Sequence, residues 1–178
     1  VELATHILCE DMCVINGQPD QNPVPLFIVK NFAFGFVFVD IHNNPQYRAD
    51  AVKNGAVALV VQNETNFKNQ IVVKNTVSAF GEMSAKWFNN PANNLKLIGV
   101  TGTNGKSTVT NIINDIYNHF DNCGYIGTIA IRYNDINLPP DLTTPNPIYL
   151  NDTLSKMVEA NVKAVALEVS SHGLDLGR

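Results

Sequence analysis

Apolar residues in the first half of the chain occur in short runs, separated by stretches in which they recur at helical spacing. Residues 78–88 show such spacing, and a second helical stretch begins at Pro45 and is closed by Gly55. The alternation predicts strands followed by helices. The expected strands are the runs rich in valine, leucine and phenylalanine, at 36–39, 56–61 and 71–73.

A second patterned region follows the polar run at 89–94, which contains a proline and which we interpret as a linker. Residues 95–101 predict a strand, and residues 106–120 predict a helix because their apolar side chains recur at helical spacing. The elements expected downstream are strands at 124–128, 129–133 and 162–169, a turn at 134–135, an extended loop through prolines 139, 140, 145 and 147, and a helix capped by Asn151 and Asp152 that runs to about residue 160.

The loop after the strand at 95–101 has the residues of a phosphate-binding loop. Gly102 and Gly105 allow backbone N–H groups to turn toward phosphate oxygens, and the N-terminus of the following helix adds positive potential. Lys106 can reach the terminal phosphates, and the hydroxyl of Ser107 can bind Mg²⁺. The general pattern has one more glycine where this chain has a valine, so a glycine-rich turn with an incidental lysine is the alternative. The predicted nucleotide-binding residues are Gly102, Thr103, Asn104, Gly105, Lys106, Ser107 and Thr108.

Two further clusters are expected at the same edge of the sheet, because ligands of open parallel sheets bind outside the carboxyl ends of the strands. Glu168 lies near the end of the strand at 162–169, where an acid can bind Mg²⁺ opposite Ser107. A capping or solvated edge carboxylate is the alternative, but an acid within an apolar strand is costly to bury without a partner. The run Thr143-Thr144-Pro145 is by itself typical of a turn, although the proline can preorganise its hydroxyls for a polar ligand.

The predicted fold class is α/β, with a small N-terminal α/β domain at 1–93 and the first part of a P-loop, mononucleotide-binding parallel-sheet domain at 94–178. A P-loop sheet normally has more strands than these, so we expect a fragment of a longer protein. The net charge of −4 offers no electrostatic footprint for nucleic acid, and no apolar run approaches the ~18 residues that span a membrane. The three cysteines fit neither a disulfide framework nor a zinc site, which favours a cytoplasmic protein without a signal peptide.

Taken together, the motifs resemble the Mur ligase family. The type that adds the third residue of the peptidoglycan stem peptide is the most similar, because the Glu-Val-Ser-Ser-His stretch at 168–172 separates it from its siblings. Folylpolyglutamate synthetase shares the fold, but its loop usually reads Gly-Lys-Gly-Ser, unlike 105–108 here. The resemblance covers 95–178 closely and 36–90 loosely. The motifs that carry it are, in chain order, 102–107, 143–145 and 168–178.

The resemblance implies an ATP-dependent ligase with Mg²⁺ as its cofactor. ATP would phosphorylate the terminal carboxylate of UDP-MurNAc-L-Ala-D-Glu, and the amine of lysine or meso-diaminopimelate would attack the acyl phosphate. An N-terminal domain would hold the UDP group, although the family's Asp-Ser-Arg signature is absent near residues 28–30. The implied roles are catalytic for Lys106, metal-binding for Ser107 and Glu168, and substrate-binding for Thr143, Thr144, Ser170 and Arg178.

Two alternatives to this ligase follow from the same residues. A relative that binds nucleotide without turnover would keep the loop at 102–108, and a P-loop NTPase of another kind would match the later motifs by accident. Because the family's C-terminal domain would lie beyond residue 178, we expect this piece to be inactive on its own. Neither nucleic acid nor a membrane is an expected partner.

Overall fold

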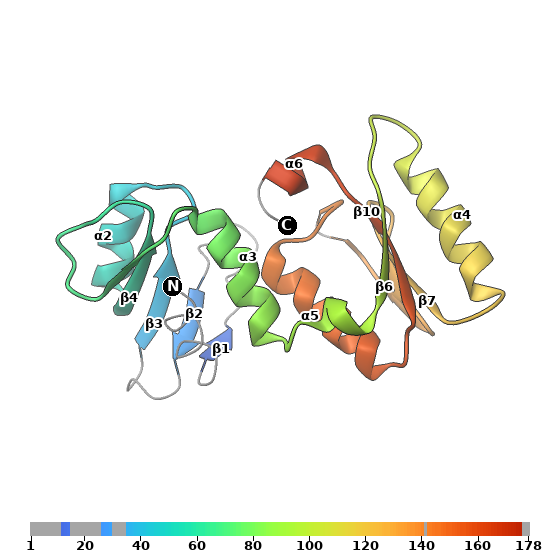
Figure 1. The fold of residues 1–178 in the computed structure, drawn as a ribbon, viewed down its shortest axis with the longest axis horizontal. Coiled ribbons are helices and arrows are strands. Elements are labelled where there is room, and N and C mark those ends of the chain that lie inside the picture. The colour runs from blue at the N-terminus through green and yellow to red at the C-terminus, as the bar shows by residue number, and fades with distance from the viewer. Residues whose placement is uncertain (1–11, 15–25, 30–34, 141, 176–178) are drawn as a thin grey trace. The chain divides into compact units, whose positions relative to one another are not determined.

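The structure, a computed structural model, describes residues 12–14, 26–29, 35–140 and 142–175 (Figure 1). The chain divides into two compact units, Val1–Met83 and Ser84–Arg178. This division falls within helix α3 (Thr76–Trp87), which corresponds to the helix predicted at 78–88. The domain limits of 1–93 and 94–178 remain a prediction.

The first unit contains a five-stranded mixed sheet in the order β1-β2-β3-β4-β5. The first three strands pair antiparallel, and the last three pair parallel. Helix α2 (Pro45–Lys53) connects the two central parallel strands, so the predicted alternation of strands and helices is confirmed here. The strands are β1 (Met12–Val14), β2 (Leu26–Val29), β3 (Gly35–Val39), β4 (Ala56–Val61) and β5 (Gln70–Val72).

The parallel strands β3 and β4 are buried on both faces, which explains why they read as continuous apolar runs. On one face, Phe38 and Leu59 pack with Ala51 of α2 in one apolar cluster. Side chains that alternate with these, such as Val37 and Val60, are also buried. The side chain of Asn44 caps α2 by accepting a hydrogen bond from the N–H of Gln46.

The second unit contains another five-stranded sheet, in the order β6-β10-β7-β8-β9. The first three strands in this order are parallel, and the last two extend the sheet antiparallel. Its strands are β6 (Lys96–Val100), β7 (Cys123–Ile126), β8 (Ile131–Tyr133), β9 (Ile136–Leu138) and β10 (Ala164–Glu168). Its helices are the 3-10 helix η1 (Pro91–Asn94), α4 (Lys106–Asn118), α5 (Pro147–Glu159) and α6 (Ser171–Asp175).

Strand β10 lies between β6 and β7, and its side chains alternate between two apolar clusters. Val165 and Leu167 pack with residues of α5, whereas Ala164 and Ala166 pack with Ile113 of α4. Strict alternation places Glu168 on the same face as these two alanines. The acid of β10 therefore lies on the α4 face, and α4 begins at the phosphate-binding loop.

One local prediction for this unit was wrong, and one strand was missed. Helix α5 begins at Pro147 and not near Asn151, because the side chain of Asn146 accepts a hydrogen bond from the N–H of Tyr149 and proline is tolerated in a first turn. Asn151 is buried inside the helix, where its side chain donates to the carbonyl of Pro147. Strand β9, which pairs with β8 across the predicted turn, was not predicted.

The sequence predicts neither a membrane-spanning helix nor a zinc site, and the described residues bear on both points. None of the helices in that part of the chain is long and apolar enough to cross a membrane. No group of three histidine, cysteine, aspartate or glutamate side chains in the described ranges is arranged to hold a metal ion. Cys123 is free and buried, and Cys9 lies outside the described residues.

Candidate functional site

The candidate site lies where three parallel strands of the second unit end together. The register pairs Glu168 of β10 with Val100 of β6 on one side, and Leu167 with Ile126 of β7 on the other. The loop that leads to α4 follows β6, and the turn that begins with Gly127 follows β7. The topology therefore brings the predicted phosphate loop, the predicted metal ligand and this turn to one edge of the sheet.

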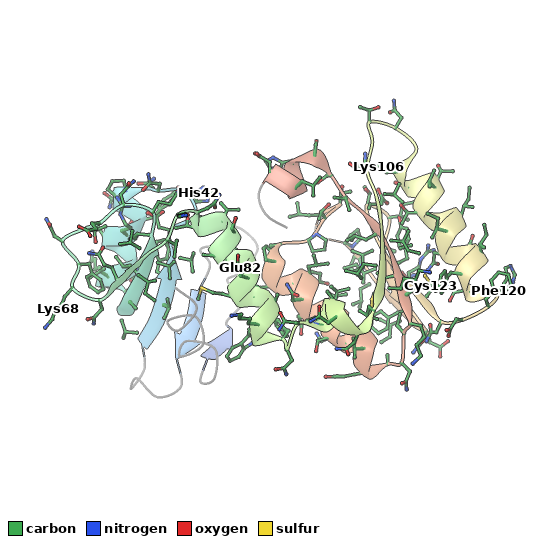
Figure 2. The ribbon with its side chains drawn as sticks, in the orientation of Figure 1. His42, Lys68, Glu82, Lys106, Phe120 and Cys123 are labelled. Carbon is green, nitrogen blue, oxygen red and sulfur yellow. The ribbon has the colours of Figure 1, made fainter. Side chains whose placement is uncertain are left out.

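The predicted phosphate loop connects β6 to α4 and is exposed from residue 101 to residue 105. Gly102 and Gly105 have φ angles of 147° and 78°, which side chains rarely adopt, so both glycines are required by the backbone. Lys106 begins α4 (Figure 2), and its Nζ donates a hydrogen bond of 2.9 Å to the carbonyl of Gly102. The lysine thus folds back over the loop, where its charge is available to an anion.

The carboxylate of Glu168 is completely buried and accepts four hydrogen bonds from neutral groups. Its Oε1 accepts from the hydroxyl of Tyr125 at 2.6 Å and from the N–H of Thr128 at 3.0 Å. Its Oε2 accepts from the hydroxyl of Ser107 at 2.9 Å and from that of Thr128 at 3.1 Å. In the described part of the chain, no lysine, arginine or histidine forms an ion pair with Glu168.

These contacts affect the protonation of the Glu168 carboxyl and of the Tyr125 phenol. Burial alone would raise the pKa of Glu168, but the hydrogen bonds from Tyr125, Ser107 and Thr128 outweigh it and lower that pKa below its ordinary value. Burial and the hydrogen bond to Glu168 raise the pKa of Tyr125 to about 12. At neutral pH the carboxylate is therefore ionised, and the phenol keeps the proton that it donates.

The donor set fits a hard divalent cation. A serine hydroxyl and an ionised carboxylate are oxygen ligands of the kind that Mg²⁺ prefers, and here they lie in direct contact beside the phosphate loop. The carboxylate carries a negative charge that no described basic side chain neutralises. The residues predicted to bind the metal, Ser107 and Glu168, are thus brought together.

The hydroxyl cluster predicted from Thr143-Thr144-Pro145 lies next to this acid. The hydroxyl of Thr144 donates to the backbone carbonyl of Glu168 at 3.0 Å and lies 3.2 Å from the hydroxyl oxygen of Ser170. Thr143 and Thr128 have their hydroxyl oxygens 3.1 Å apart. The structure therefore brings Thr143, Thr144 and Ser170 together, while Arg178 lies outside the described residues.

Four residues of the site were not predicted from the sequence. Tyr125 and Thr128 bond to the carboxylate, and Asn111 and Arg132 support them from α4 and β8. A signal was present for Thr128, because Gly-Thr directly follows an apolar strand, and a Gly-Thr pair also stands one residue after the strand that leads to the phosphate loop. The other three depend on which strands are neighbours, and the sequence pattern does not give that order.

Residues 100–178 match the Mur ligase middle domain. The chain is 39% identical over 142 residues to the UDP-N-acetylmuramoyl-L-alanyl-D-glutamate–2,6-diaminopimelate ligase of Bacillus cereus. This alignment covers 79% of this chain and 28% of that protein. It is 40% identical over an alignment of 188 residues to the enzyme of the same name from Oceanobacillus iheyensis, covering 100% of this chain and 38% of that protein. A solved structure of a ligase with this name superposes with a TM-score of 0.62 at 30% identity, over 74% of this chain and 27% of the other. The chain thus spans well under half the length of the curated relatives that it matches.

Proposed function

Because the chain belongs to the Mur ligase family, we propose that it is part of an ATP-dependent ligase that adds an amino acid to UDP-MurNAc-L-Ala-D-Glu in peptidoglycan synthesis. The observation that carries this proposal is the 2.9 Å contact between the hydroxyl of Ser107 and the carboxylate of Glu168. It joins the phosphate loop to the Glu-Val-Ser-Ser-His motif, although the two are 61 residues apart in the chain. The amino acid that we propose is 2,6-diaminopimelate, after the names of the relatives, with lysine as the alternative.

The nucleotide half of the reaction is assigned to the loop and its neighbours. Residues 102–108 hold the ATP phosphates through backbone N–H groups, and the ammonium of Lys106 neutralises the phosphoryl group as it is transferred. Ser107 and Glu168 hold Mg²⁺, which when bound offsets the charge of the phosphate oxygens. The exposure of the loop leaves this edge of the sheet accessible to a nucleotide.

The acceptor half is assigned to the hydroxyl cluster and Arg178. Thr143, Ser170 and Arg178 contact the muramoyl dipeptide, and the guanidinium pairs with a substrate carboxylate. Thr144 is only 2% exposed, so its part in substrate binding is to hold Ser170, whose N–H donates to the threonine hydroxyl at 2.9 Å. ATP phosphorylates the dipeptide's terminal carboxylate, and the amine of the amino acid then displaces phosphate from the acyl phosphate.

We assign residues 1–93 to binding the UDP group and residues 94–178 to the first part of the ATP-binding domain, in a cytoplasmic enzyme. The match of 100–178 to the Mur ligase middle domain supports the second assignment. Since the chain covers 28% and 38% of two relatives, the activity belongs to a full-length protein.

The test is ADP formation by the full-length protein. We expect ADP only when both UDP-MurNAc-L-Ala-D-Glu and a diamino acid are present, and no ADP from the Lys106→Ala variant. Lys163→Ala is the matched control, because Lys163 is exposed at the opposite end of β10 and should leave the rate unchanged.

Three results would contradict the proposal in different ways. ADP release that ignores the muramoyl substrate indicates another kind of P-loop NTPase. Nucleotide binding without ADP release indicates a binding module that lacks turnover. A requirement for a folate in place of the muramoyl dipeptide indicates a ligase like folylpolyglutamate synthetase.

A further inference from the structure

The two oxygens of the Glu168 carboxylate are held by different kinds of donor. Oε1 is bonded by a buried phenol from β7 and by a backbone N–H of the following turn. Among the described residues, Oε2 is bonded only by the hydroxyls of Ser107 and Thr128, which can rotate toward other acceptors. A carboxylate offers about four lone-pair positions, and here four hydrogen bonds occupy them. A cation can therefore bind the Glu168 carboxylate only where a hydroxyl rotates away. The oxygen that meets this condition is Oε2, which lies next to the phosphate loop.

The phenol that holds Oε1 is itself held in place by burial and by a neighbouring arginine. Tyr125 is completely buried, and its cross-strand partner in the sheet is Arg132 of β8. The guanidinium carbon of Arg132 lies 4.6 Å from the centre of the tyrosine ring, which is the geometry of a cation–π contact. The ring therefore has little freedom to turn its hydroxyl away from Glu168.

The same arginine connects the phenol back to the phosphate loop. Arg132 donates a hydrogen bond to the side-chain oxygen of Asn111 on α4. Asn111 in turn donates to the backbone carbonyl of Ser107 at 2.8 Å. The contacts thus close a ring, which we call the positioning ring, composed of Ser107, Asn111, Arg132, Tyr125 and Glu168.

Gly127 shows how tightly the turn closes over this ring. A Cβ atom at Gly127 would lie 2.2 Å from Oε1 of Glu168 and 2.6 Å from the hydroxyl oxygen of Tyr125. Real Cβ atoms essentially never approach so closely. The phenol–carboxylate pair is therefore covered closely by the backbone of the turn.

We infer that Tyr125 is a positioning residue for the cation site: it fixes Oε1 of Glu168, so that Oε2 is presented beside Ser107, and Arg132 and Asn111 keep both ligands in register. This inference rests on the proposed use of Mg²⁺ with ATP. It assigns no chemical step to Tyr125, which acts only through Glu168. Groups that orient metal ligands in this way typically change metal affinity by 10-fold to 100-fold when they are removed.

The test is the Tyr125→Phe variant of the full-length protein, which removes the hydroxyl and keeps the ring under Arg132. We measure ATP affinity by calorimetry without the muramoyl substrate, once with Mg²⁺ and once with EDTA. The expected result is a loss of roughly tenfold in affinity with Mg²⁺ and no change in EDTA. In turnover, the Mg²⁺ concentration for half-maximal rate should rise by a similar factor, while the rate at saturating Mg²⁺ falls less.

Tyr133→Phe is the matched control, because Tyr133 is also buried on a neighbouring strand but lies outside the positioning ring. It should leave both Mg²⁺ measurements unchanged. Equal losses with Mg²⁺ and in EDTA would overturn the inference, since they indicate a general change of the loop, and so would wild-type Mg²⁺ dependence. If the wild-type protein binds Mg²⁺–ATP but ignores the muramoyl substrate, the proposed function fails while the binding data still test the ring.

Discussion

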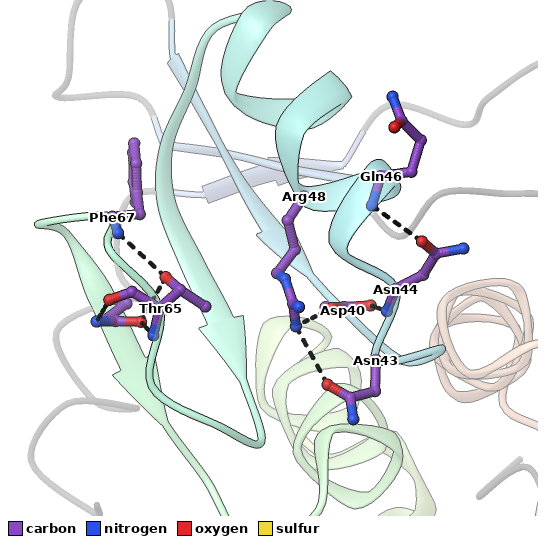
Figure 3. A network of polar contacts seen from close by, with 8 residues as sticks. Asp40, Asn43, Asn44, Gln46, Arg48, Thr65 and Phe67 are labelled. Carbon is purple, nitrogen blue, oxygen red and sulfur yellow. Dashed lines mark hydrogen bonds and ion pairs between the residues drawn. The ribbon is translucent and has the colours of Figure 1, made fainter.

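Among the described residues, each unit of the molecule buries one acid where a parallel strand ends, and these two acids have opposite surroundings. Asp40 directly follows β3 and is 1% exposed, and Glu168 ends β10 and is 0% exposed. Asp40 forms an ion pair of 2.9 Å with Arg48 of α2 and also accepts from the N–H of Asn44 (Figure 3). Glu168 accepts only neutral hydrogen bonds from described residues.

The difference shows what a buried carboxylate is available for. The charge of Asp40 is neutralised within its own unit, and Arg48 bonds as well to the side chain of Asn43, so this network ties α2 to the end of β3 (Figure 3). Glu168 keeps an ionised carboxylate with no cation of its own among the described residues. Burying such a charge is costly unless something pairs with it. Asp40 therefore serves the fold, and Glu168 is suited to a cation that arrives with a ligand.

Glu168→Gln should have the largest effect of the changes that separate these two roles. The amide keeps an oxygen for the Tyr125 and Thr128 donors, and its NH₂ group can donate to hydroxyls that rotate to accept. We therefore expect the free energy of unfolding to change by less than about 1 kcal/mol. Mg²⁺-dependent ADP formation should fall by at least about 100-fold, because the cation loses its anionic ligand.

Urea unfolding and ADP release by the full-length protein measure these two quantities. A loss of stability of about 2 kcal/mol, as expected when a partner of a partly buried ion pair is removed, would contradict the comparison, since Glu168 would then be needed for the fold as well.

Asp40→Asn should produce the reverse pattern. The oxygen of the asparagine can still accept from the N–H of Asn44. Its NH₂ group, however, then faces the guanidinium of Arg48, which loses the oxygen that accepted its hydrogen bond. Because Arg48 still reaches Asn43 and is 16% exposed, we expect a cost of about 2 kcal/mol, below that of a fully buried pair.

Hydrogen exchange in β3 and α2, together with urea unfolding, would register this loss, while the affinity for ATP with Mg²⁺ should stay at the parent value. Asp50→Asn is the control on α2: Asp50 is exposed and its carboxylate accepts only from Gln46 among the described contacts, so the loss of stability should be within about 0.5 kcal/mol. Equal effects at Asp40 and Asp50 would mean that burial of the ion pair is immaterial.

The sequence pattern drew attention to Glu168 more clearly than to Asp40. Glu168 interrupts an apolar strand, which marks it as unusual, and its link to Ser107 follows from the rule that ligands bind at the ends of parallel strands. Asp40 follows an equally apolar strand, yet its sequence neighbours, Ile41 and His42, do not point to Arg48 as its partner. That pairing depends on how α2 returns over the sheet.

The supporting residues of the site could not be predicted for a similar reason. Tyr125 and Arg132 face each other only because β7 and β8 form a hairpin with a defined register, and Tyr125 reaches Glu168 only because β10 inserts between β6 and β7. Local patterns gave the elements themselves. Strand order and cross-strand register arise from tertiary packing, which periodicity within one segment does not encode.

A third carboxylate, on the surface, is expected to contribute least to stability. Asp152 on α5 accepts from the ammonium of Lys156 at 2.6 Å, closer than Asp40 and Arg48, but the two side chains are 31% and 57% exposed. Both side chains stay hydrated, so the pair contributes little to the free energy of unfolding despite its short distance. Asp152→Asn should cost only about 0.3–0.5 kcal/mol, as expected for an i, i+4 pair on a helix surface.

The salt dependence separates this pair from the buried one. At about 1 M salt the screening length falls to about 3 Å, so the stability difference between Asp152→Asn and the parent should vanish in urea unfolding. The difference caused by Asp40→Asn should persist there, because its ion pair is shielded from solvent ions. If both differences disappeared together, burial would not protect the Asp40–Arg48 pair from salt, and the contrast between Asp40 and Glu168 would lose its physical basis.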